Sequence, residues 1–477
     1  MASVSDISAL DQMVAQYRLS KRKPAQALET KRSALNIRLA VLADLKTKLK
    51  TLMTTAEDLK KTGTTSKFNT FSVASTNTSI ATATATTTAD VGAHSLKIAR
   101  LAKNDTLLSD RVTAAATTVS AAEGAGTKTF RLSINGTDTD VSVEVVNGDT
   151  NETLLSKLVT VINDSGAEVT ASSVGDTSTT KKLVLISKSS GASNAVAVSD
   201  VTGTLMERFG FSAAVISGRT ANGTTTAGYA NSSVTQLNAS FTVDGITVEK
   251  ESNTVSDVLT GVTLELKGTQ ADADLPITLT VGVNKASIKE KVQKFITDYN
   301  AALSYLNIKT QYDSLTKTRE ALSGDAIFTS FRYNLRSLAT EAVSSVKPGY
   351  PTILADIGIT AGRDGTLSLS DATKFDEALD DDLTKVSDLF NSTNGVAAKL
   401  VTLIDGMTNS ATGKIVSVKD AADSQVLSLT NRITRFDETL SKHVEKYRSD
   451  FLRLQATYNQ ILAQQQTISS ITSSYYY

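Results

Sequence analysis

Leucines recur at every seventh position near the start of the chain, which is the spacing of an apolar seam along a helix. The seam runs through Leu28, Leu35, Leu42, Leu49 and Ala56, and Leu45, Leu52 and Leu59 follow their neighbours by three positions. This pattern predicts one long helix. We expect Pro24 in its first turn, where the missing N–H would have had no helical partner.

A second heptad series occupies the C-terminal end of the chain. It repeats through Val426, Ile433, Leu440, Tyr447, Leu454 and Ile461, with Leu429 and Phe436 completing the first repeats and Val444, Phe451 and Tyr458 following one place later. Because these last three residues come one place later in the heptad, the apolar stripe becomes wider, as in a straight helix with 3.6 residues per turn. A helix over residues 419–469 would be roughly 75 Å long, too long for one compact domain. Because the apolar residues of both seams must be buried against another surface, we expect the two terminal helices to pair. An internal helical hairpin is the alternative.

Between residues 68 and 283 the apolar residues alternate with polar ones, as in β-strands. Asn135-Gly136 and Asp244-Gly245 are strong turn signals and predict two hairpins. Further strands are expected at Val262, Leu264 and Leu266 and at Ile277, Leu279 and Val281. The Thr-rich run 75–89 has the composition of a disordered segment or of an exposed strand. We interpret the whole block as antiparallel β.

Helical spacing returns after residue 283. It runs through Ile288, Val292, Phe295, Tyr299, Leu303 and Leu306, and again through Ile327, Phe331, Leu335 and Leu338. Pro348 and Pro351 break the second of these helices into a turn. A short hairpin at Asp364-Gly365 precedes one more helix, which carries Phe375, Leu379, Leu383 and Val386.

The predicted fold class is therefore α+β, with helical ends around nested antiparallel β domains. A terminal coiled-coil domain, the stalk, is expected from residues 1–45 and 425–477, and a helical leg domain from 46–74 and 284–424. An inner β head domain is expected from 75–107 and 227–283. The outer β head domain, 108–226, is expected as an insertion between strands of the inner one.

Composition narrows the classes of function. The chain of 477 residues has 49 Lys and Arg against 49 Asp and Glu, which argues against a general binder of nucleic acid or anionic membranes. It has no cysteine, so disulfides, thiolate nucleophiles and Cys-ligated metals are excluded. It shows neither a cleavable signal peptide nor a run of apolar residues long enough to span a membrane.

Candidate chemistry is sparse, and we expect no catalytic, cofactor or metal site. His94 and His443 are the only histidines and lie far apart in the sequence; His94 is expected at the surface and His443 in the C-terminal seam. The acidic cluster at 376–382 lacks the spacing of a calcium loop and is interpreted as a solvated helix face. Nucleotide-binding and nucleophile motifs do not occur.

Several segments, in order along nearly the whole chain, closely resemble the flagellar hook-associated protein 2 family, the filament caps. The central ones are VDGITV at 243–248, SNTVSD at 252–257 and GVTLEL at 261–266. HSLKIARLA at 94–102, FITDYN at 295–300 and DGTLSL at 364–369 resemble other parts of that family, and 168–200 resembles a repeat of flagellin and hook-associated heads. The stretch before Leu10 departs from the family in lacking a Gly-rich start.

The resemblance implies a homo-oligomeric ring at the distal tip of the flagellar filament, outside the cell, under which exported flagellin folds and inserts. It also implies contacts with hook-associated junction proteins, a cytosolic export chaperone and the type III flagellar export apparatus, without a cleaved signal peptide, nucleic acid or membrane insertion. Some members also adhere to host mucus. The implied interaction seam is Leu28, Leu35, Leu42, Leu49, Val426, Leu429, Ile433, Phe436, Leu440, Tyr447, Phe451, Leu454, Tyr458 and Ile461.

Alternatives inside and outside this structural class remain open at this point. A hook–filament junction protein or a flagellin shares helical termini and a β head, although the segments at 243–266 favour the cap. A surface adhesin or fibre would also combine a Thr-rich β middle with a long coil. An enzyme is the weakest reading, because no catalytic constellation is found.

Overall fold

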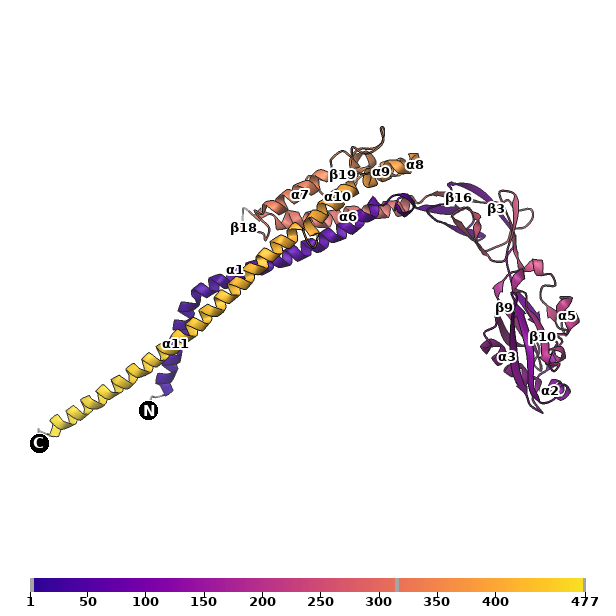
Figure 1. Cartoon of the computed structure of the whole chain (residues 1–477), viewed down its shortest axis with the longest axis horizontal. Coiled ribbons are helices and arrows are strands. Elements are labelled where there is room, and N and C mark those ends of the chain that lie inside the picture. Colours follow the sequence, from indigo (N-terminus) through magenta and orange to yellow (C-terminus); the bar gives the residue numbers. More distant parts are fainter. Residues whose placement is uncertain (1–3, 314–316, 475–477) are drawn as a thin grey trace. The chain divides into compact units, whose positions relative to one another are not determined.

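The computed structural model describes residues 4–313 and 317–474 and divides into two compact units (Figure 1). The first unit combines the chain up to Phe68 with the chain from Lys285 onwards, and the second contains residues 69–284. Residues 1–3 and 475–477, at the ends of the predicted stalk, lie outside the described residues. The α+β class is confirmed, with long terminal helices and antiparallel sheets. The division into four domains stays a prediction.

The first unit is mainly helical. Its elements are α1 (Val4–Lys60), η1 (Gly63–Thr65), α6 (Lys285–Lys309), β17 (Tyr312–Asp313), β18 (Thr318–Arg319), α7 (Ala326–Leu338), η4 (Leu354–Ile357), β19 (Ile359–Ala361), β20 (Leu367–Leu369), α8 (Ala372–Asp381), α9 (Leu383–Asn391), α10 (Val396–Thr408) and α11 (Lys414–Ser474). α1 packs against α6, α10 and α11. Figure 1 shows α11 returning along α1, so that the two run in opposite directions.

Aromatic side chains join the shorter helices of this unit into one core. The apolar face predicted for α6 is buried. Phe295 on α6 meets Phe390 of α9 edge-on, with ring centroids 5.7 Å apart, and Phe390 also packs against Phe68. The hydroxyl of Tyr299 donates to the carbonyl of Leu335 on α7 at 3.1 Å, so this polar group is satisfied inside the core.

The expected position of Pro24 is wrong. α1 begins at Val4, so the proline lies inside the helix. It offers no N–H to the carbonyl of Ser20, and its ring crowds that turn, which bends a helix. Figure 1 shows α1 changing direction in its indigo, N-terminal part. Contacts with α11 on the N-terminal side of the proline hold the helix together there, including a stack of Tyr17 on Tyr447.

Two helices replace the single one expected over 375–386. Asp382 adopts an extended conformation (φ −161°, ψ 115°), so it ends α8 and begins α9. Its carboxylate accepts a hydrogen bond from the backbone N–H of Thr384 at 2.8 Å, which caps α9. The hydroxyl of Tyr350 donates to the same carboxylate at 2.6 Å and contributes to the lowered pKa of Asp382.

The acidic cluster is not simply a solvated face, as the sequence suggested. Asp376 pairs with Lys289 of α6 at 2.8 Å, and Asp380 pairs with Lys285 at 2.6 Å. Asp381 pairs with Lys385 of α9. The cluster therefore attaches α8 to its neighbours, and its two contacts with α6 depend on lysines more than eighty positions away, which the local pattern did not reveal.

The second unit holds most of the strands. Its elements are β1 (Phe71–Ser75), β2 (Ala81–Ala85), β3 (Gly92–Arg100), β4 (Asn104–Leu108), β5 (Val112–Thr113), α2 (Thr118–Glu123), β6 (Gly126–Ile134), β7 (Thr137–Val145), α3 (Asn151–Asp164), β8 (Val169–Gly175), β9 (Thr180–Ser190), η2 (Ala192–Asn194), β10 (Ala197–Thr202), α4 (Leu205–Arg208), α5 (Ala213–Ser217), β11 (Gly228–Tyr229), η3 (Val234–Leu237), β12 (Ala239–Val243), β13 (Ile246–Lys250), β14 (Thr254–Leu259), β15 (Val262–Leu266) and β16 (Ile277–Val283). The strand orders are β1-β16-β3-β12-β13, β14-β15-β2, β10-β6-β7 and β11-β4-β9-β5, with β8 beside β9.

Both hairpins predicted in the β block are confirmed, as is the short hairpin at Asp364-Gly365 in the first unit, where β19 pairs with β20. β6 and β7 pair across Asn135-Gly136, and β12 and β13 pair across Asp244-Gly245. All four turn residues have positive φ, from 49° at Asn135 to 82° at Gly245, as a two-residue hairpin turn requires. The Thr-rich run, left open between disorder and strand, contributes strand β2, which pairs with β15.

The interpretation of the middle block as purely β is wrong at α3. This helix begins at a Thr150 cap, whose hydroxyl accepts a hydrogen bond from the N–H of Thr153. It buries Leu154, Leu155, Leu158 and Ile162 on one face. The capping threonine and this spacing were present in the sequence, but the run lay inside a block that was interpreted as β throughout.

Two separate hydrophobic cores lie within the second unit. The outer core is formed between Leu107 and Tyr229, and the inner core draws on residues before and after that stretch. β1 belongs to the inner sheet through its pairing with β16, although the sequence placed it at the end of the helical leg. The backbone N–H of Lys103 donates to the carbonyl of Leu237 at 2.8 Å, so the chain enters and leaves the outer core at neighbouring points.

Candidate interaction surface

The pairing of the terminal helices rests on three polar and aromatic contacts. The rings of Tyr17 and Tyr447 stack with centroids 4.7 Å apart and an angle of 3° between their planes. Arg22 donates from Nε and Nη2 to the two carboxylate oxygens of Asp437, at 3.0 and 3.2 Å. The hydrogen bond from Arg22 holds the pKa of Asp437 below its usual range. Arg448 and Asp11 form a further, exposed ion pair at 3.1 Å.

The expected seam residues fall into three classes of exposure. Four are buried, namely Leu42, Leu49, Ile433 and Leu440. Seven are half-buried, namely Leu28, Leu35, Val426, Leu429, Phe436, Tyr447 and Phe451. Three are exposed, namely Leu454 at 68%, Tyr458 at 59% and Ile461 at 54%. The burial of the seam side chains therefore decreases towards the C-terminal end of α11.

The exposed class lies where α11 continues past α1. Figure 1 shows the yellow end of α11 without a neighbouring helix in the described part of the chain. Phe451, Leu454, Tyr458 and Ile461 fall on one side of the helix and border a shallow hollow of about 360 Å³. An apolar stripe that faces water on a helix marks a contact surface for another protein. We call these four residues the terminal stripe.

Sequence reasoning missed how far the apolar surface extends. Leu462, Ile468 and Ile471 are also exposed on α11, at 38%, 63% and 51%. A signal for this was present, because the sequence from Leu454 to the C-terminus contains no charged residue. A helix that carries no charge over several turns is poorly suited to remain in water alone.

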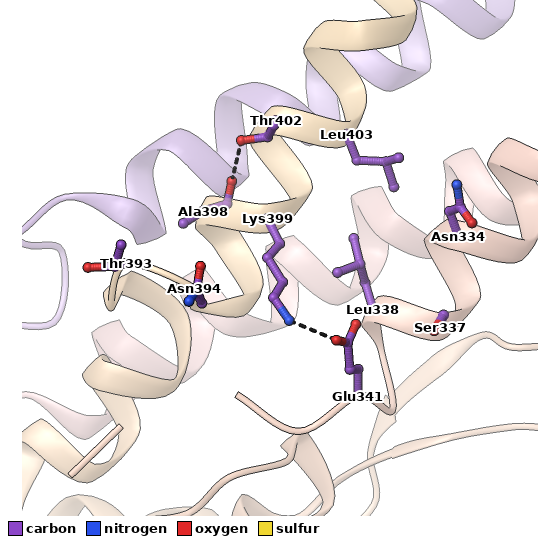
Figure 2. Close-up of a pocket in the computed structure, with 10 residues that line it drawn as sticks. All are labelled: Asn334, Ser337, Leu338, Glu341, Thr393, Asn394, Ala398, Lys399, Thr402 and Leu403. Carbon is purple, nitrogen blue, oxygen red and sulfur yellow. Dashed lines mark hydrogen bonds and ion pairs between the residues drawn. The ribbon is translucent and has the colours of Figure 1, made fainter. Parts of the chain in front are cut away.

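A second hollow, of about 470 Å³, lies between α7 and α10 (Figure 2). Leu338 and Leu403 face it, and Lys399 of α10 forms an ion pair with Glu341 at 3.0 Å. Figure 2 shows amide and hydroxyl side chains around the rest of the opening, among them Asn334 and Asn394. None of its ten lining residues is a histidine. Apart from this ion pair the lining is apolar or neutral and polar, which suits non-covalent contact.

The two histidines occupy different surroundings. His94, expected at the surface, lies half-buried in β3, and its Nδ1 is 2.8 Å from Oδ2 of Asp244 in the β12–β13 turn. The same carboxylate accepts a hydrogen bond from the N–H of Ser95, and the contact with His94 is the main cause of the lowered pKa of Asp244. His443 is exposed on α11. The pair of His94 and Asp244 attaches a turn to a strand.

Two other kinds of site are absent from the described residues. No three or more His, Cys, Asp or Glu side chains gather there in an arrangement that would hold a metal ion. None of the described helices combines the length and hydropathy needed to cross a membrane.

Comparison with known families gives two matches to one family. Residues 8–105 match the flagellar hook-associated protein 2 N-terminus, and residues 237–463 match the flagellar hook-associated protein 2 C-terminus. The stretch between these two matches contains the outer core. The end of α11 beyond residue 463 also lies outside them.

Individual relatives agree with these matches. The chain is 32% identical to the B-type flagellar hook-associated protein 2 of Pseudomonas aeruginosa over 43% of its length and 44% of the relative. It spans about half the length of the first curated relatives it matches. It is 26% identical to flagellar hook-associated protein 2 of Escherichia coli K12 over 95% of both chains.

A solved structure shares the fold. The crystal structure of domains D1 to D3 of the flagellar cap protein FliD from Escherichia coli superposes with a TM-score of 0.58 at 25% identity. The superposition covers 80% of this chain and 99% of that one. Matches at both ends of the sequence and this shared architecture lead to one conclusion: the chain belongs to the flagellar hook-associated protein 2 family.

Proposed function

We propose that this chain caps the flagellar filament. In this role several copies form a ring at the distal tip, outside the cell, and exported flagellin folds and inserts beneath them. The role is structural and not enzymatic. Membership of the hook-associated protein 2 family supports the proposal, as does the description of the related Escherichia coli structure as a flagellar cap protein.

The terminal stripe is the observation that carries the mechanism. Leu454, Tyr458 and Ile461 are each more than half exposed, although they are large apolar residues on one face of a helix. A cap must hold the filament end and yet allow new subunits to enter, which calls for an adhesive surface that the single subunit leaves uncovered. In this proposal the stripe binds neighbouring copies and flagellin, while the paired part of α1 and α11 keeps it in position.

The remaining partners follow from the same proposal. Before export, the uncovered stripe needs shielding from water, which a cytosolic export chaperone provides. The type III flagellar export apparatus then delivers the chain without a cleaved signal peptide, and hook-associated junction proteins form the base on which the first cap assembles. Adhesion to a host surface would be a second role of the β unit.

Charged substitutions in the stripe test the proposal. Leu454→Asp combined with Ile461→Asp places two carboxylates in a surface that becomes apolar on assembly, at a cost of several kcal/mol. Since both side chains are exposed, the isolated subunit should keep its stability. In a strain lacking its own cap gene, the variant should give short or absent filaments and flagellin leaked into the medium.

The matched control is Ala463→Asp, which adds a carboxylate to an exposed position on the opposite face of the same helix. It should support filaments of normal length. Normal filaments with the stripe variant, or equal failure of both variants, would show that the stripe does not carry the function.

A further inference from the structure

A third hollow, of about 660 Å³, lies between α1, α11 and the segment after β18. Leu28 and Leu35 of α1 and Leu429 of α11 form its apolar floor, and all three are half-buried. The two α1 leucines are two helical turns apart, about 10 Å along the axis. The hollow is thus a trough that can receive two turns of another helix, and it shares no residue with the terminal stripe. We call it the leucine trough.

Positive charge surrounds the leucine trough. Its lining includes four basic residues, Lys31, Arg38, Arg319 and Arg432, and one acidic residue, Glu320. Arg38 is compensated by Asp325 at 2.6 Å, and Glu320 is already paired with Lys309 at 3.1 Å. Within the described residues, Lys31 and Arg432 have no acidic partner. The rim therefore carries positive charge that the described residues do not neutralise.

The surrounding part of α1 strengthens this field. Residues 18–50 contain ten lysines and arginines but only two acidic residues, although the chain as a whole is neutral. Clustered charge of one sign attracts a partner of the opposite sign and speeds its association. An occupant of the trough therefore gains from carrying carboxylates.

We propose that the leucine trough binds an acidic amphipathic helix of another protein. The helix would place apolar side chains with i, i+3 or i+4 and i+7 spacing on the three leucines, as helix-in-groove complexes do. Asp or Glu residues flanking that stripe would face Lys31, Arg319 and Arg432. The inference does not depend on capping, because it concerns different residues from those of the terminal stripe.

Other occupants fit the trough less well. The C-terminal part of α11 from a second copy has the apolar stripe but no charged residue after Arg453, so it would leave the basic rim uncompensated. An anionic membrane or a nucleic acid would neutralise the rim but would leave the leucine floor without apolar contact. Only a partner with both features satisfies both parts of the surface.

Binding of synthetic peptides to the full-length protein tests the proposal. The first peptide is a helix with a leucine stripe flanked by glutamates, and the second has the same stripe flanked by lysines. We expect fluorescence anisotropy to show binding of the glutamate peptide that weakens with added salt, and much weaker binding of the lysine peptide. Equal binding of the two peptides would overturn the proposal.

Variants place the binding in the trough. Lys31→Glu with Arg432→Glu reverses two rim charges and should weaken binding of the glutamate peptide about tenfold. Lys50→Glu with Lys442→Glu is the matched control, since both residues are exposed on the same helices outside the trough. Circular dichroism would verify that all variants keep their helices. Equal effects of the two pairs would overturn the proposal.

Anionic vesicles distinguish the membrane alternative. Phosphatidylserine vesicles should neither displace the glutamate peptide nor bind the protein more tightly than uncharged vesicles do. If they displace it, and if the Lys31→Glu and Arg432→Glu variant abolishes vesicle binding, the trough is a membrane-contact site and the proposal is wrong.

Discussion

At the scale of single residues, the most constrained charge in the second unit is the buried carboxylate of Asp105. It is fully inaccessible to solvent and accepts hydrogen bonds from Arg219 at 2.5 and 3.0 Å and from the N–H of Val196 at 2.9 Å. The guanidinium of Arg219 also lies 4.1 Å from the ring centroid of Tyr229. These contacts join the beginning, middle and end of the outer core, so a few atoms hold together segments more than a hundred positions apart.

Removal of Arg219 should therefore be severely destabilising. Arg219→Ala leaves the Asp105 carboxylate buried without its counter-charge, at a cost of about 3–5 kcal/mol. Urea unfolding followed by fluorescence or circular dichroism measures the loss. Arg131→Ala is the control, because Arg131 pairs with Asp140 on the exposed face of the β6–β7 hairpin and its loss should cost far less stability. Similar losses for the two variants would show that burial does not set the strength of the Asp105 pair.

The pair of His94 and Asp244 should contribute to stability only above acidic pH. Its hydrogen bond lowers the pKa of Asp244 in the folded state, so the contribution is present above the unfolded pKa, near 3.9, and is lost as the pH falls through the folded value. Asp244→Asn keeps a residue that tolerates the positive φ of this turn and an acceptor for Ser95. Unfolding midpoints of wild type and variant should differ slightly near neutral pH and converge in acid. A constant difference across that range would contradict this assignment.

Such residue pairs mark the limit of what the sequence could predict. The Asp244-Gly245 turn was evident because turn chemistry is local, but its bond to His94 depends on the register of β12 against β3. The same reason hides the link between Arg219 and Asp105, and the pairing of the acidic residues of α8 with lysines of α6. Long-range register and packing decide these contacts, and neither leaves a periodic trace in the chain.

At the scale of elements, the hydrophobic periodicity predicted where helices and strands occur, but it predicted their first and last residues less well. The heptad series located both long helices, and the turn pairs located all three predicted hairpins. Pro24 was misplaced because a local helix-start rule was applied where tertiary contacts with α11 maintain the helix. α3 was missed because its helix cap and helical stripe lay inside a block that was interpreted as β throughout.

The two parts of α11 should differ in local stability. Ile433 and Leu440 are buried, whereas Leu454 and the apolar residues after it are exposed. Helical hydrogen bonds without packing open readily, because an isolated helix is marginal in water. Hydrogen exchange on the isolated subunit should therefore be slow around 433–440 and fast over 454–471. Uniform protection along the whole helix would mean that the C-terminal part is covered in solution, against the proposed role of the stripe.

At the scale of the whole molecule, the parts of the chain differ in how far they match the family and in which proposed surfaces they carry. The family matches cover most of the two long helices and the inner core but not the outer core, which lies between the two matched stretches. The proposed functional surfaces, the terminal stripe and the leucine trough, both belong to the first unit. The outer core is thus the part that capping, as proposed here, needs least.

Deletion of the outer core should leave a chain that folds and still caps. Lys103 and Leu237 are joined by a backbone hydrogen bond of 2.8 Å, so a short glycine linker can replace residues 104–236 without stretching the inner sheet. The inner core keeps all its buried residues, from Ala81 to Val281, after this deletion. It loses polar contacts at the junction, such as the hydrogen bonds from Ser190 and Ser193 to Glu251, which lowers its stability modestly.

Circular dichroism and urea unfolding should show a cooperative transition at a reduced midpoint. In a capless strain the deletion should restore filaments, though fewer or shorter than those of the intact chain. Filament loss as complete as that caused by the Leu454→Asp and Ile461→Asp variant, in a deletion chain that still unfolds cooperatively, would mean that the outer core is essential to capping and that the terminal stripe is not sufficient to hold the cap.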